Sequence, residues 1–497
     1  MVGHFDRLAG TTESERMTMK LKNKKRWIVI TVIILFHIVG FLSSIDAVMG
    51  TRTSQGAIAW VVSLNTFPYV AVPAYWVLGR SKFKGYVSSR QEGDHEIRSF
   101  ALQAREETMD QCSNLSEEHT ATRASELLAK IPVLKNNQVK LLVDGQQTFD
   151  SIFEGIDAAK EYILVQFFIV KDDELGRELK SRLLARARAG VRVYFLYDEV
   201  GSHDLPKSYL KELREAGAEI LDFHTRKGPS NRFQINFRNH RKIVVVDGHT
   251  ACVGGHNVGD EYMGRDPEFG HWRDTHVKIV GPAVIAVQVS FLEDWHWATG
   301  KAPEFNWTPH IPEEEGFDVL IFPTGPSDPL ETATLMFLNG INSAKKRLWI
   351  ASPYFVPDES IMNALHLAAL RGVDVRIIIP DKADHLMVYL AAYSYFEEAR
   401  ATGIRFFRYM DGFMHQKVVL IDDEFSAVGT ANFDNRSFRL NFEIMAVGYD
   451  TDFANEIEEM LLADLEDSVE MQPGDLDKKS YWFKLGTRLA RLTAPIQ

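Results

Sequence analysis

Two segments of the sequence repeat one arrangement of polar residues, H-x-K-x4-D. The repeats consist of His240, Lys242 and Asp247 in the first segment and of His415, Lys417 and Asp422 in the second. On a β-strand, residues i and i+2 lie on the same face, so each histidine is expected to point the same way as its lysine. A single copy usually marks a surface histidine beside a surface lysine. Two copies with the same continuation indicate a functional site.

Each copy continues with small residues and an asparagine at matching distances. These residues are Gly254, Gly255 and Asn257 after the first motif and Gly429, Thr430 and Asn432 after the second. Glycine permits a close approach of the backbone to a ligand, and the asparagine amide supplies a neutral donor. An imidazole, a lysine and an amide from each copy would together form a cationic pocket. A phosphate diester is its natural occupant, because the lysines would neutralise its charge.

Polar residues beyond the motifs are candidates to support the histidines. The second copy is followed by Asp434, Ser437 and Glu443. The first copy has Tyr262 where the serine is expected, and Asp274 is expected to play the part of Glu443. This asymmetry suggests that the two histidines have different tasks.

The elements that carry these motifs are apolar strands alternating with amphipathic helices, which is typical of an α/β fold. The segments YILVQFFIV and VRVYFLY predict strands at 162–170 and 191–197, with a helix at 173–188 between them. The same order recurs downstream, so we predict two duplicated α/β halves packed about a pseudo-twofold axis. The first half is placed at 136–310 and the second, which ends in a C-terminal helix, at 311–497.

Two apolar stretches, 27–42 and 56–78, precede these halves. Each approaches the ~20 residues that a membrane-spanning helix needs. We predict a transmembrane helical hairpin at 27–79, after a basic N-terminus at 1–26 and before a linker with helices at 80–135. A cleaved signal followed by one anchor is the alternative.

Basic residues flank the hairpin on both sides. Lysines and arginines cluster at 20–26 and again at 80–90, whereas the loop between the stretches carries only Arg52. By the positive-inside rule, both ends of a multi-pass protein would lie in the cytoplasm, with the catalytic portion facing the cytoplasm.

Composition narrows the possible partners. The chain has 497 residues, and its 68 acidic against 56 basic residues give a net charge of −12. A duplex-DNA-binding protein usually has the opposite balance, so no nucleic acid partner is expected. Two cysteines exclude a disulfide framework and a four-cysteine zinc site. We expect no metal ion and no cofactor.

Through both H-x-K-x4-D motifs the sequence resembles the phospholipase D superfamily, and within it the bacterial cardiolipin synthases. The supporting segments are GGHNVGDEYMG, HWRDTHVKIVGPAV and GTANFDNRSFRLNFE. The resemblance covers about residues 130 to 497. It implies two phospholipase D-like halves and a place in the bacterial inner membrane.

The resemblance also implies a reaction. A phosphatidyltransferase of this kind makes cardiolipin from two phosphatidylglycerol molecules and releases glycerol, through a phosphatidyl-histidine intermediate. Relatives with two motifs suggest His240 as the nucleophile and His415 as the acid and base, although the surrounding residues favour neither assignment. The expected partners are phospholipid substrates and the membrane.

Several alternatives stay open at this point. The same motifs suit a membrane-anchored nuclease or a phospholipase that admits water, and a non-enzymatic membrane scaffold is disfavoured because both motifs are intact. Asp247 and Asp422 either belong to the catalytic set or pair with a lysine or cap a turn. The segment 481–494 is either an interfacial helix that touches anionic lipid or a packing helix. The second lipid and the oligomeric state are not predicted.

Overall fold

A computed structural model of the chain describes residues 13–79, 86, 94–223, 236–423 and 425–497. The chain divides into two compact units, residues 1–81 and residues 82–497. Part of the predicted basic N-terminus (1–12) and part of the predicted linker (80–85 and 87–93) lie outside the described residues.

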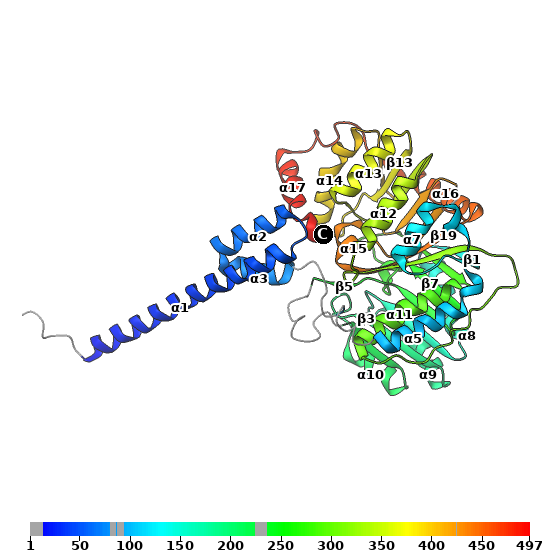
Figure 1. The fold of residues 1–497 in the computed structure, drawn as a ribbon, viewed down its shortest axis with the longest axis horizontal. Coiled ribbons are helices and arrows are strands. Elements are labelled where there is room, and N and C mark those ends of the chain that lie inside the picture. The colour runs from blue at the N-terminus through cyan, green and yellow to red at the C-terminus, as the bar shows by residue number, and fades with distance from the viewer. Residues whose placement is uncertain (1–12, 80–85, 87–93, 224–235, 424) are drawn as a thin grey trace, which may run out of the picture. The chain divides into compact units, whose positions relative to one another are not determined.

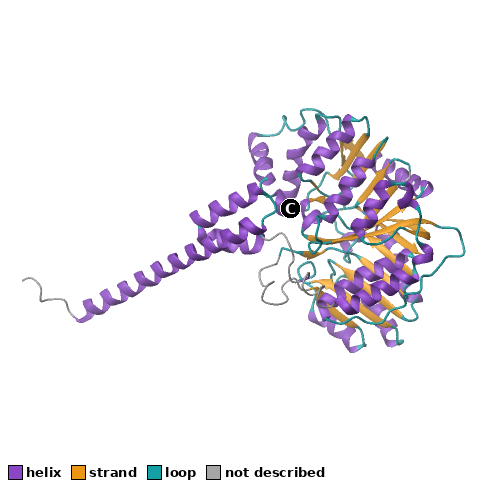
Figure 2. Ribbon diagram, in the orientation of Figure 1, coloured by secondary structure: helices purple, strands orange, loops and turns teal. Residues whose placement is uncertain are grey.

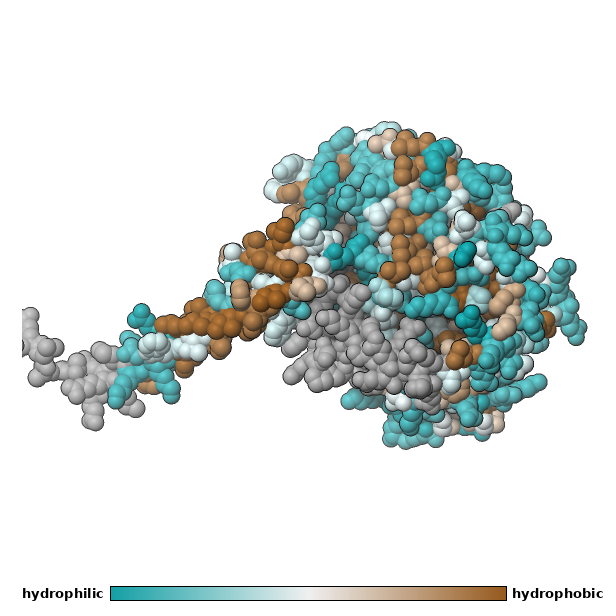
Figure 3. Space-filling view, in the orientation of Figure 1, coloured by the Kyte–Doolittle hydropathy of each residue, from teal (hydrophilic) through white to brown (hydrophobic). Residues whose placement is uncertain are grey.

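The N-terminal unit contains the helices α1 (Glu13–Gly50), α2 (Ser54–Thr66) and α3 (Pro68–Leu78). Within the described part of the chain, one helix is long and apolar enough to cross a membrane, over Lys20–Gly50. Its apolar side chains are exposed, for example Trp27 and Phe41, and they form the brown band along α1 in Figure 3. This pattern suits a lipid environment.

The predicted hairpin of two transmembrane helices is wrong. The second apolar stretch is interrupted at Phe67, and α2 and α3 are 13 and 11 residues long. Proline disfavours a helical conformation in the residue before it, and Phe67 has φ −131° and ψ 56°. Pro68 then occupies the first turn of α3, where its missing N–H costs nothing. Leu64 and Tyr75, from the two short helices, pack in one apolar cluster with Ala47 of α1.

The second unit, residues 82–497, carries both motifs and is called the catalytic unit below. It is an α/β structure built on one 16-stranded mixed sheet, with helices on both faces (Figures 1 and 2). The main strands of the first half are β1 (Leu134–Val143), β2 (Tyr162–Phe167), β3 (Arg192–Asp198), β4 (Glu219–Phe223), β6 (Ile243–Val246), β7 (Thr250–Gly254) and β9 (Thr275–Val280). Those of the second half are β10 (Phe317–Thr324), β11 (Arg347–Ala351), β13 (Asp374–Pro380), β14 (Arg405–Tyr409), β16 (Val418–Ile421), β17 (Phe425–Gly429), β19 (Asn441–Tyr449) and β20 (Ser468–Glu470).

The two halves repeat one strand order, which confirms the predicted duplication. The first runs β1-β9-β7-β6-β2-β3-β4 and the second β10-β19-β17-β16-β11-β13-β14. The strands β1 and β10 pair antiparallel, with Leu134 opposite Val319, and so join both halves into one sheet. Strands such as β2 and β16 are buried along their whole length, which explains their continuous apolar sequences.

Helices cover both faces of this sheet. The helices of the first half are α8 (Asp144–Ala158), α9 (Glu174–Arg188), α10 (Lys207–Glu215) and α11 (Ala283–Thr299), after α5 (Asp94–Glu107), α6 (Leu115–Glu118) and α7 (Thr120–Ala129). Those of the second half are α12 (Thr332–Ser343), α13 (Glu359–Leu370), α14 (Leu386–Arg400), α15 (Asn435–Arg439), α16 (Thr451–Glu466) and α17 (Tyr481–Arg491). Successive residues of β2, such as Leu164 and Val165, point to opposite faces of the sheet and enter separate apolar clusters.

Short strands link the halves a second time. β5 (Arg238–Asn239) pairs with the start of β19, and β15 (Phe413–Met414) pairs with β8 (Trp272–Arg273). The strand that precedes each motif histidine is therefore held by a strand of the other half. This brings the two motifs to one place.

Candidate active site

Each motif histidine is held by the backbone of the opposite half. The N–H of His240 donates to the carbonyl oxygen of Phe442 at 2.9 Å, and the N–H of His415 donates to that of Arg273 at 2.8 Å. Both side chains are nearly buried, with 7% of each residue exposed. His240 and Lys242 lie in the connection between β5 and β6, not inside a strand as predicted, because β5 pairs across to β19 before β6 begins.

The carboxylates that orient the histidines are exchanged between the halves. His240 Nδ1 lies 2.9 Å from Oε2 of Glu443, and His415 Nδ1 lies 2.7 Å from Oδ2 of Asp274. A carboxylate on Nδ1 favours the tautomer that carries its proton there, which leaves the lone pair on Nε2. Both acids were predicted from the sequence, but the exchange was not, since it depends on pairing between residues 203 and 141 positions apart.

Two buried lysines stand beside the histidines. Lys242 and Lys417 are 0% and 1% exposed. The Nζ of Lys242 donates to the carbonyl oxygen of His240 at 2.7 Å, and the Nζ of Lys417 lies 2.9 Å from His415 Nδ1 and contacts the His415 carbonyl oxygen. Each lysine therefore lies against its own histidine, and the centre gathers two lysine side chains around the imidazoles.

Burial shifts the protonation equilibria of these groups. It lowers the pKa of His240 to about 4, although the charge of Glu443 opposes the shift. Burial, together with the charges of Lys417 and Lys242, lowers the pKa of His415 well below its usual value. Burial also lowers the pKa of Lys417 to about 8 and that of Lys242 well below its ordinary range. An anion at this position would reverse these shifts, because it stabilises the charged forms.

Glu443 stays ionised within a set of hydrogen-bond donors. Its carboxylate accepts from Thr430 Oγ1 at 2.6 Å, from Ser437 Oγ at 2.8 Å and from Asn441 Nδ2 at 3.1 Å. Burial alone would raise its pKa, but the charge and hydrogen bond of His240 hold the pKa below the usual value. Thr430 and Ser437 therefore support the acid that orients His240.

Asp434 caps the short helix α15. Its Oδ1 accepts the N–H of Ser437 at 2.7 Å, and burial raises the pKa of Asp434 to about 6. It thus acts on the site through Ser437.

The two motif asparagines have different surroundings. Asn257 donates to the hydroxyl of Tyr262 at 3.1 Å and accepts the N–H of Ile169 at 3.1 Å. The Oδ1 of Asn432 is buried and has no hydrogen-bond partner among the described residues. Its backbone N–H donates to Ser437 Oγ at 3.0 Å. Asn257 is therefore fixed by the protein, whereas the amide oxygen of Asn432, which can only accept, is left without a partner among the described residues.

The motif glycines make room for protein neighbours. A Cβ on Gly255 would overlap the carboxylate of Asp274, and a Cβ on Gly254 would overlap the ring of His276. A Cβ on Gly429 would overlap the backbone at Ile444. These glycines let the carboxylate-bearing strands approach the motifs.

The motif aspartates stand at the far ends of β6 and β16 from the histidines. Asp247 and Asp422 have left-handed φ values of 53° and 52°. Their carboxylates accept backbone N–H groups at the starts of β2 and β11, from Lys160, Glu161 and Tyr162 and from Lys345, Lys346 and Arg347 respectively. This geometry supports the turn-capping alternative.

The residue between histidine and lysine anchors each motif to a buried acid, which sequence reasoning missed. Arg241 donates to Asp294 of α11 at 2.8 Å, and Gln416 donates to Asp464 of α16 at 2.6 Å. Asp464 also receives two hydrogen bonds from Arg273, next to Asp274. For Asp294, the signal available in the sequence was an acidic residue within the apolar helix α11. Asp464 had no such signal, because α16 carries several other acidic residues.

A second feature that the sequence did not reveal is a pair of buried histidines beside the first motif. Nδ1 of His256 lies 3.1 Å from Nδ1 of His276, and burial lowers the pKa of His256 to about 4. Both residues are at most 1% exposed. They are therefore neutral and pack behind Gly254.

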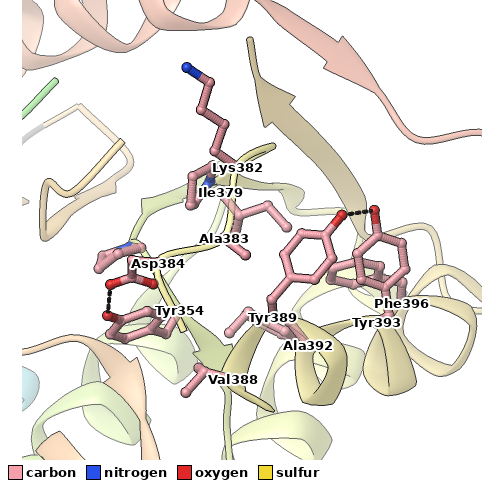
Figure 4. Close-up of a pocket in the computed structure, with 13 residues that line it drawn as sticks. Tyr354, Ile379, Lys382, Ala383, Asp384, Val388, Tyr389, Ala392, Tyr393 and Phe396 are labelled. Atoms are coloured by element: carbon pink, nitrogen blue, oxygen red, sulfur yellow. Dashed lines mark hydrogen bonds between the residues drawn. The ribbon is translucent and has the colours of Figure 1, made fainter. Parts of the chain in front are cut away.

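A small pocket lies beside the second motif (Figure 4). Its walls come from Ile379 at the end of β13, from Asp384 in the following loop and from α14 residues such as Val388. The hydroxyl of Tyr354 donates to the carboxylate of Asp384 at the pocket wall. Tyr354 precedes β12 (Phe355–Val356), which pairs with β18 (Phe433–Asp434) directly after Asn432. Phe355, which lines the pocket, is therefore paired with the residue that follows Asn432.

Two H-x-K-x4-D motifs that meet across one duplicated sheet define a phospholipase D-like protein. The catalytic unit is similar in fold to the crystal structure of phosphatidylserine synthase from Haemophilus influenzae Rd KW20, with a TM-score of 0.57 and 17% identity over 76% of this chain and 100% of that chain. The family model for the cardiolipin synthase, PLD-like domain matches residues 152–295 and 337–465. The chain belongs to this family.

Curated relatives extend the similarity to nearly the whole chain. Cardiolipin synthase A of Pseudomonas putida (strain W619) is 49% identical over 474 residues, which cover 93% of this chain and 97% of that protein. Cardiolipin synthase A of Pseudomonas aeruginosa (strain LESB58) is 48% identical over 465 residues, covering 93% and 94%. The match includes much of the N-terminal unit, because it covers 93% of the chain, a larger share than residues 82–497 alone make up.

Proposed function

We propose that the protein transfers the phosphatidyl group of one phosphatidylglycerol to the free primary hydroxyl of a second, which forms cardiolipin and releases glycerol. The observation that carries this proposal is the exchange of carboxylates, which supports two equally oriented histidines at one cationic centre. The names of the curated relatives agree with it.

In the first step, Nε2 of His240 attacks the phosphorus atom of the donor lipid. A P–N bond forms, the bond from phosphorus to the glycerol oxygen breaks, and protonated His415 gives its proton to that oxygen. His415 gains its proton in the substrate complex, because the phosphodiester anion raises the pKa of the imidazoles it meets. The products of this step are glycerol and a phosphatidyl-histidine.

In the second step, neutral His415 takes the proton of the acceptor hydroxyl, whose oxygen attacks phosphorus. The P–N bond breaks and His240 is restored. Lys242, Lys417 and the amide NH2 group of Asn432 hold the non-bridging oxygens, where charge develops in both steps. Glu443 and Asp274 keep the imidazoles in the required tautomer.

The pocket beside Asn432 distinguishes a transferase from a hydrolase in this proposal. The carboxylate of Asp384 and the hydroxyl of Tyr354 suit the hydroxyl groups of a glycerol headgroup, and apolar side chains form the rest of the wall. The pocket holds about one water molecule, so an acceptor alcohol would enter only after its walls move apart, and it would then exclude water from the intermediate. A phospholipase D-type hydrolase is the second candidate, since it would use the same first step.

Vesicles that contain phosphatidylglycerol labelled in its headgroup and acyl chains test the proposal. We expect one cardiolipin and one free glycerol for every two phosphatidylglycerol molecules consumed. The variants His240→Ala and His415→Ala should each abolish turnover while the protein stays folded. Glycerol release with phosphatidic acid in place of cardiolipin would establish the hydrolase, and either variant with near-normal turnover would refute the two-histidine mechanism.

We further propose that α1 anchors the protein in the bacterial inner membrane. The support is its run of exposed apolar side chains over Lys20–Gly50. Cysteines introduced near positions 52 and 100, after replacement of Cys112 and Cys252, can be labelled in intact cells. A single span places positions 52 and 100 on the same side of the membrane, so labelling of one but not the other by an impermeant reagent would refute it.

A further inference from the structure

The C-terminal helix α17 has an apolar face that the fold does not cover. Tyr481, Leu485, Leu489 and Leu492 are spaced at i, i+4, i+8 and i+11, so they form one stripe along the helix, and Trp482 lies beside it. Tyr481, Trp482 and Leu492 are 71%, 76% and 76% exposed. We call these five residues the outer face of α17.

A different stripe attaches α17 to the protein. Thr487 and Ala490 are buried, and the ring of Phe483 contacts that of Tyr393 on α14 at a centroid distance of 5.2 Å. Figure 1 shows the two helices side by side. Packing therefore explains residues 483, 487 and 490. It leaves Tyr481, Trp482, Leu489 and Leu492 of the outer face exposed to solvent, where they carry a cost, and Leu485 half-buried.

Basic residues border the outer face. Residues 478–497 contain five lysines and arginines and no acidic residue, within a chain of net charge −12. Three of the five form surface ion pairs, namely Lys478 with Asp475, Lys484 with Asp477 and Arg491 with Glu398. Lys484 and Arg488 lie next to the apolar stripe on the helix surface, and Arg488 is exposed. Exposed leucines, aromatic rings at one end and a flanking cationic stripe form the pattern of a helix that lies in a lipid interface.

The attachment of α17 also relates this face to the candidate active site. Tyr393, which meets Phe483, is one of the residues that line the pocket beside the second motif (Figure 4). A surface that rests on α14 is thus mechanically tied to the wall of the pocket proposed for the acceptor lipid.

We propose that the outer face of α17 docks the catalytic unit onto an anionic bilayer, as a membrane contact separate from α1. The occupant is the lipid surface, because the cationic stripe matches anionic headgroups and the aromatic and aliphatic side chains match the region beneath them. The contact holds the pocket side of the second half at the surface that supplies its substrate. This last consequence rests on the proposed function, whereas the docking itself does not.

The full-length protein in proteoliposomes tests the docking without any turnover. An environment-sensitive fluorophore is attached at Trp482→Cys and, as a matched control, at Leu127→Cys, because Leu127 of α7 is similarly exposed (71%). We expect the label at 482 to shift to the blue and to be quenched by spin-labelled lipids, more strongly as the phosphatidylglycerol content rises over phosphatidylcholine. The label at 127 should not respond.

Activity supplies the second readout. The variant Trp482→Ser/Leu489→Ser/Leu492→Ser should raise the KM for phosphatidylglycerol, expressed as mole fraction, about 5- to 10-fold and leave kcat within about twofold. Lys484→Gln/Arg488→Gln should remove the dependence of the 482 signal on anionic lipid. Equal signals at 482 and 127 in every vesicle would overturn the proposal. Energy transfer between labelled copies that accounts for the shift would also overturn it, because a second copy of the protein, and not lipid, would then cover the outer face. A wild-type protein that makes no cardiolipin but gives the fluorescence shift would refute the proposed function alone.

Discussion

Replacing Glu443 with glutamine tests the exchange of carboxylates between the halves. The wild-type carboxylate receives four hydrogen bonds, from His240, Thr430, Ser437 and Asn441, and is fully buried. The single carbonyl oxygen of glutamine accepts two of them, and its NH2 group meets further donors. One or two donors are then left unpaired, at about 1–3 kcal/mol each. We expect a lower thermal midpoint from a protein that still folds.

The catalytic effect should be much larger than the effect on stability. Glutamine lacks the negative charge that stabilises the positive charge developing on the His240 ring as Nε2 bonds to phosphorus. The corresponding exchange of an acid for its amide in a Ser-His-Asp triad lowers kcat about 10⁴-fold. We expect Glu443→Gln to lower kcat by about 10²- to 10⁴-fold in vesicles of labelled phosphatidylglycerol, with the folded fraction measured by circular dichroism. Ser437→Ala, which keeps the carboxylate and removes one donor, is the matched control and should cost less than about tenfold.

Nuclear magnetic resonance of the histidine nitrogens shows whether each histidine pairs with the acid of the opposite half or with the acid of its own half. The Nδ1–H signal of His240 should move in Glu443→Gln and not in Asp274→Asn, and the signal of His415 should respond the other way. The reasoning fails if Glu443→Gln keeps kcat within about threefold of wild type. It also fails if each histidine responds to the acid of its own half.

Three further outcomes follow from the geometry. Asp247→Asn and Asp422→Asn should each lower the thermal midpoint, because each carboxylate caps three backbone N–H groups. Both variants should leave kcat within about twofold of wild type. A loss of kcat without a loss of stability would return these residues to the catalytic set. The folded protein should lose stability as the pH falls from about 6.5 towards 4, because burial holds the pKa of His256 at about 4 and the unfolded chain then binds more protons. His256→Asn should reduce that loss by about 3 kcal/mol in pH-dependent melting, whereas the exposed His203→Asn should not. Asp384→Asn should raise the ratio of phosphatidic acid to cardiolipin in the product, and an unchanged ratio would exclude the pocket as the acceptor site.

The sequence predicted the duplicated α/β halves, both motifs and the two acids, because each of these signals is local. His240 and Lys242, or Asn432, Ser437 and Glu443, lie within a few residues of one another, so spacing alone relates them. The exchange of Glu443 and Asp274 could not be predicted. It results from the pairing of β5 with β19 and of β15 with β8, between residues far apart in the chain.

In the N-terminal unit, a local feature of the sequence was missed because the prediction averaged over it. Composition over 56–78 predicted a spanning helix, but one peptide unit, Phe67–Pro68, divides it into α2 and α3. Averaged hydropathy does not register a single proline that excludes the helical conformation before it. The outer face of α17 raises a related difficulty. Its amphipathic pattern predicted a helix, but only the packing of Phe483, Thr487 and Ala490 shows which face is left exposed.

The covalent intermediate tests the central claim most directly. Phosphatidylglycerol labelled at phosphorus is mixed with the protein in vesicles, the reaction is quenched rapidly without acid, and peptides are mapped by mass spectrometry. We predict a phosphoryl adduct on Nε2 of His240, which forms and decays at rates compatible with kcat and is absent in His240→Ala. An adduct on His415 would reverse the roles of the two histidines. The absence of an adduct on either, with inversion of configuration at phosphorus, would contradict the two-step mechanism.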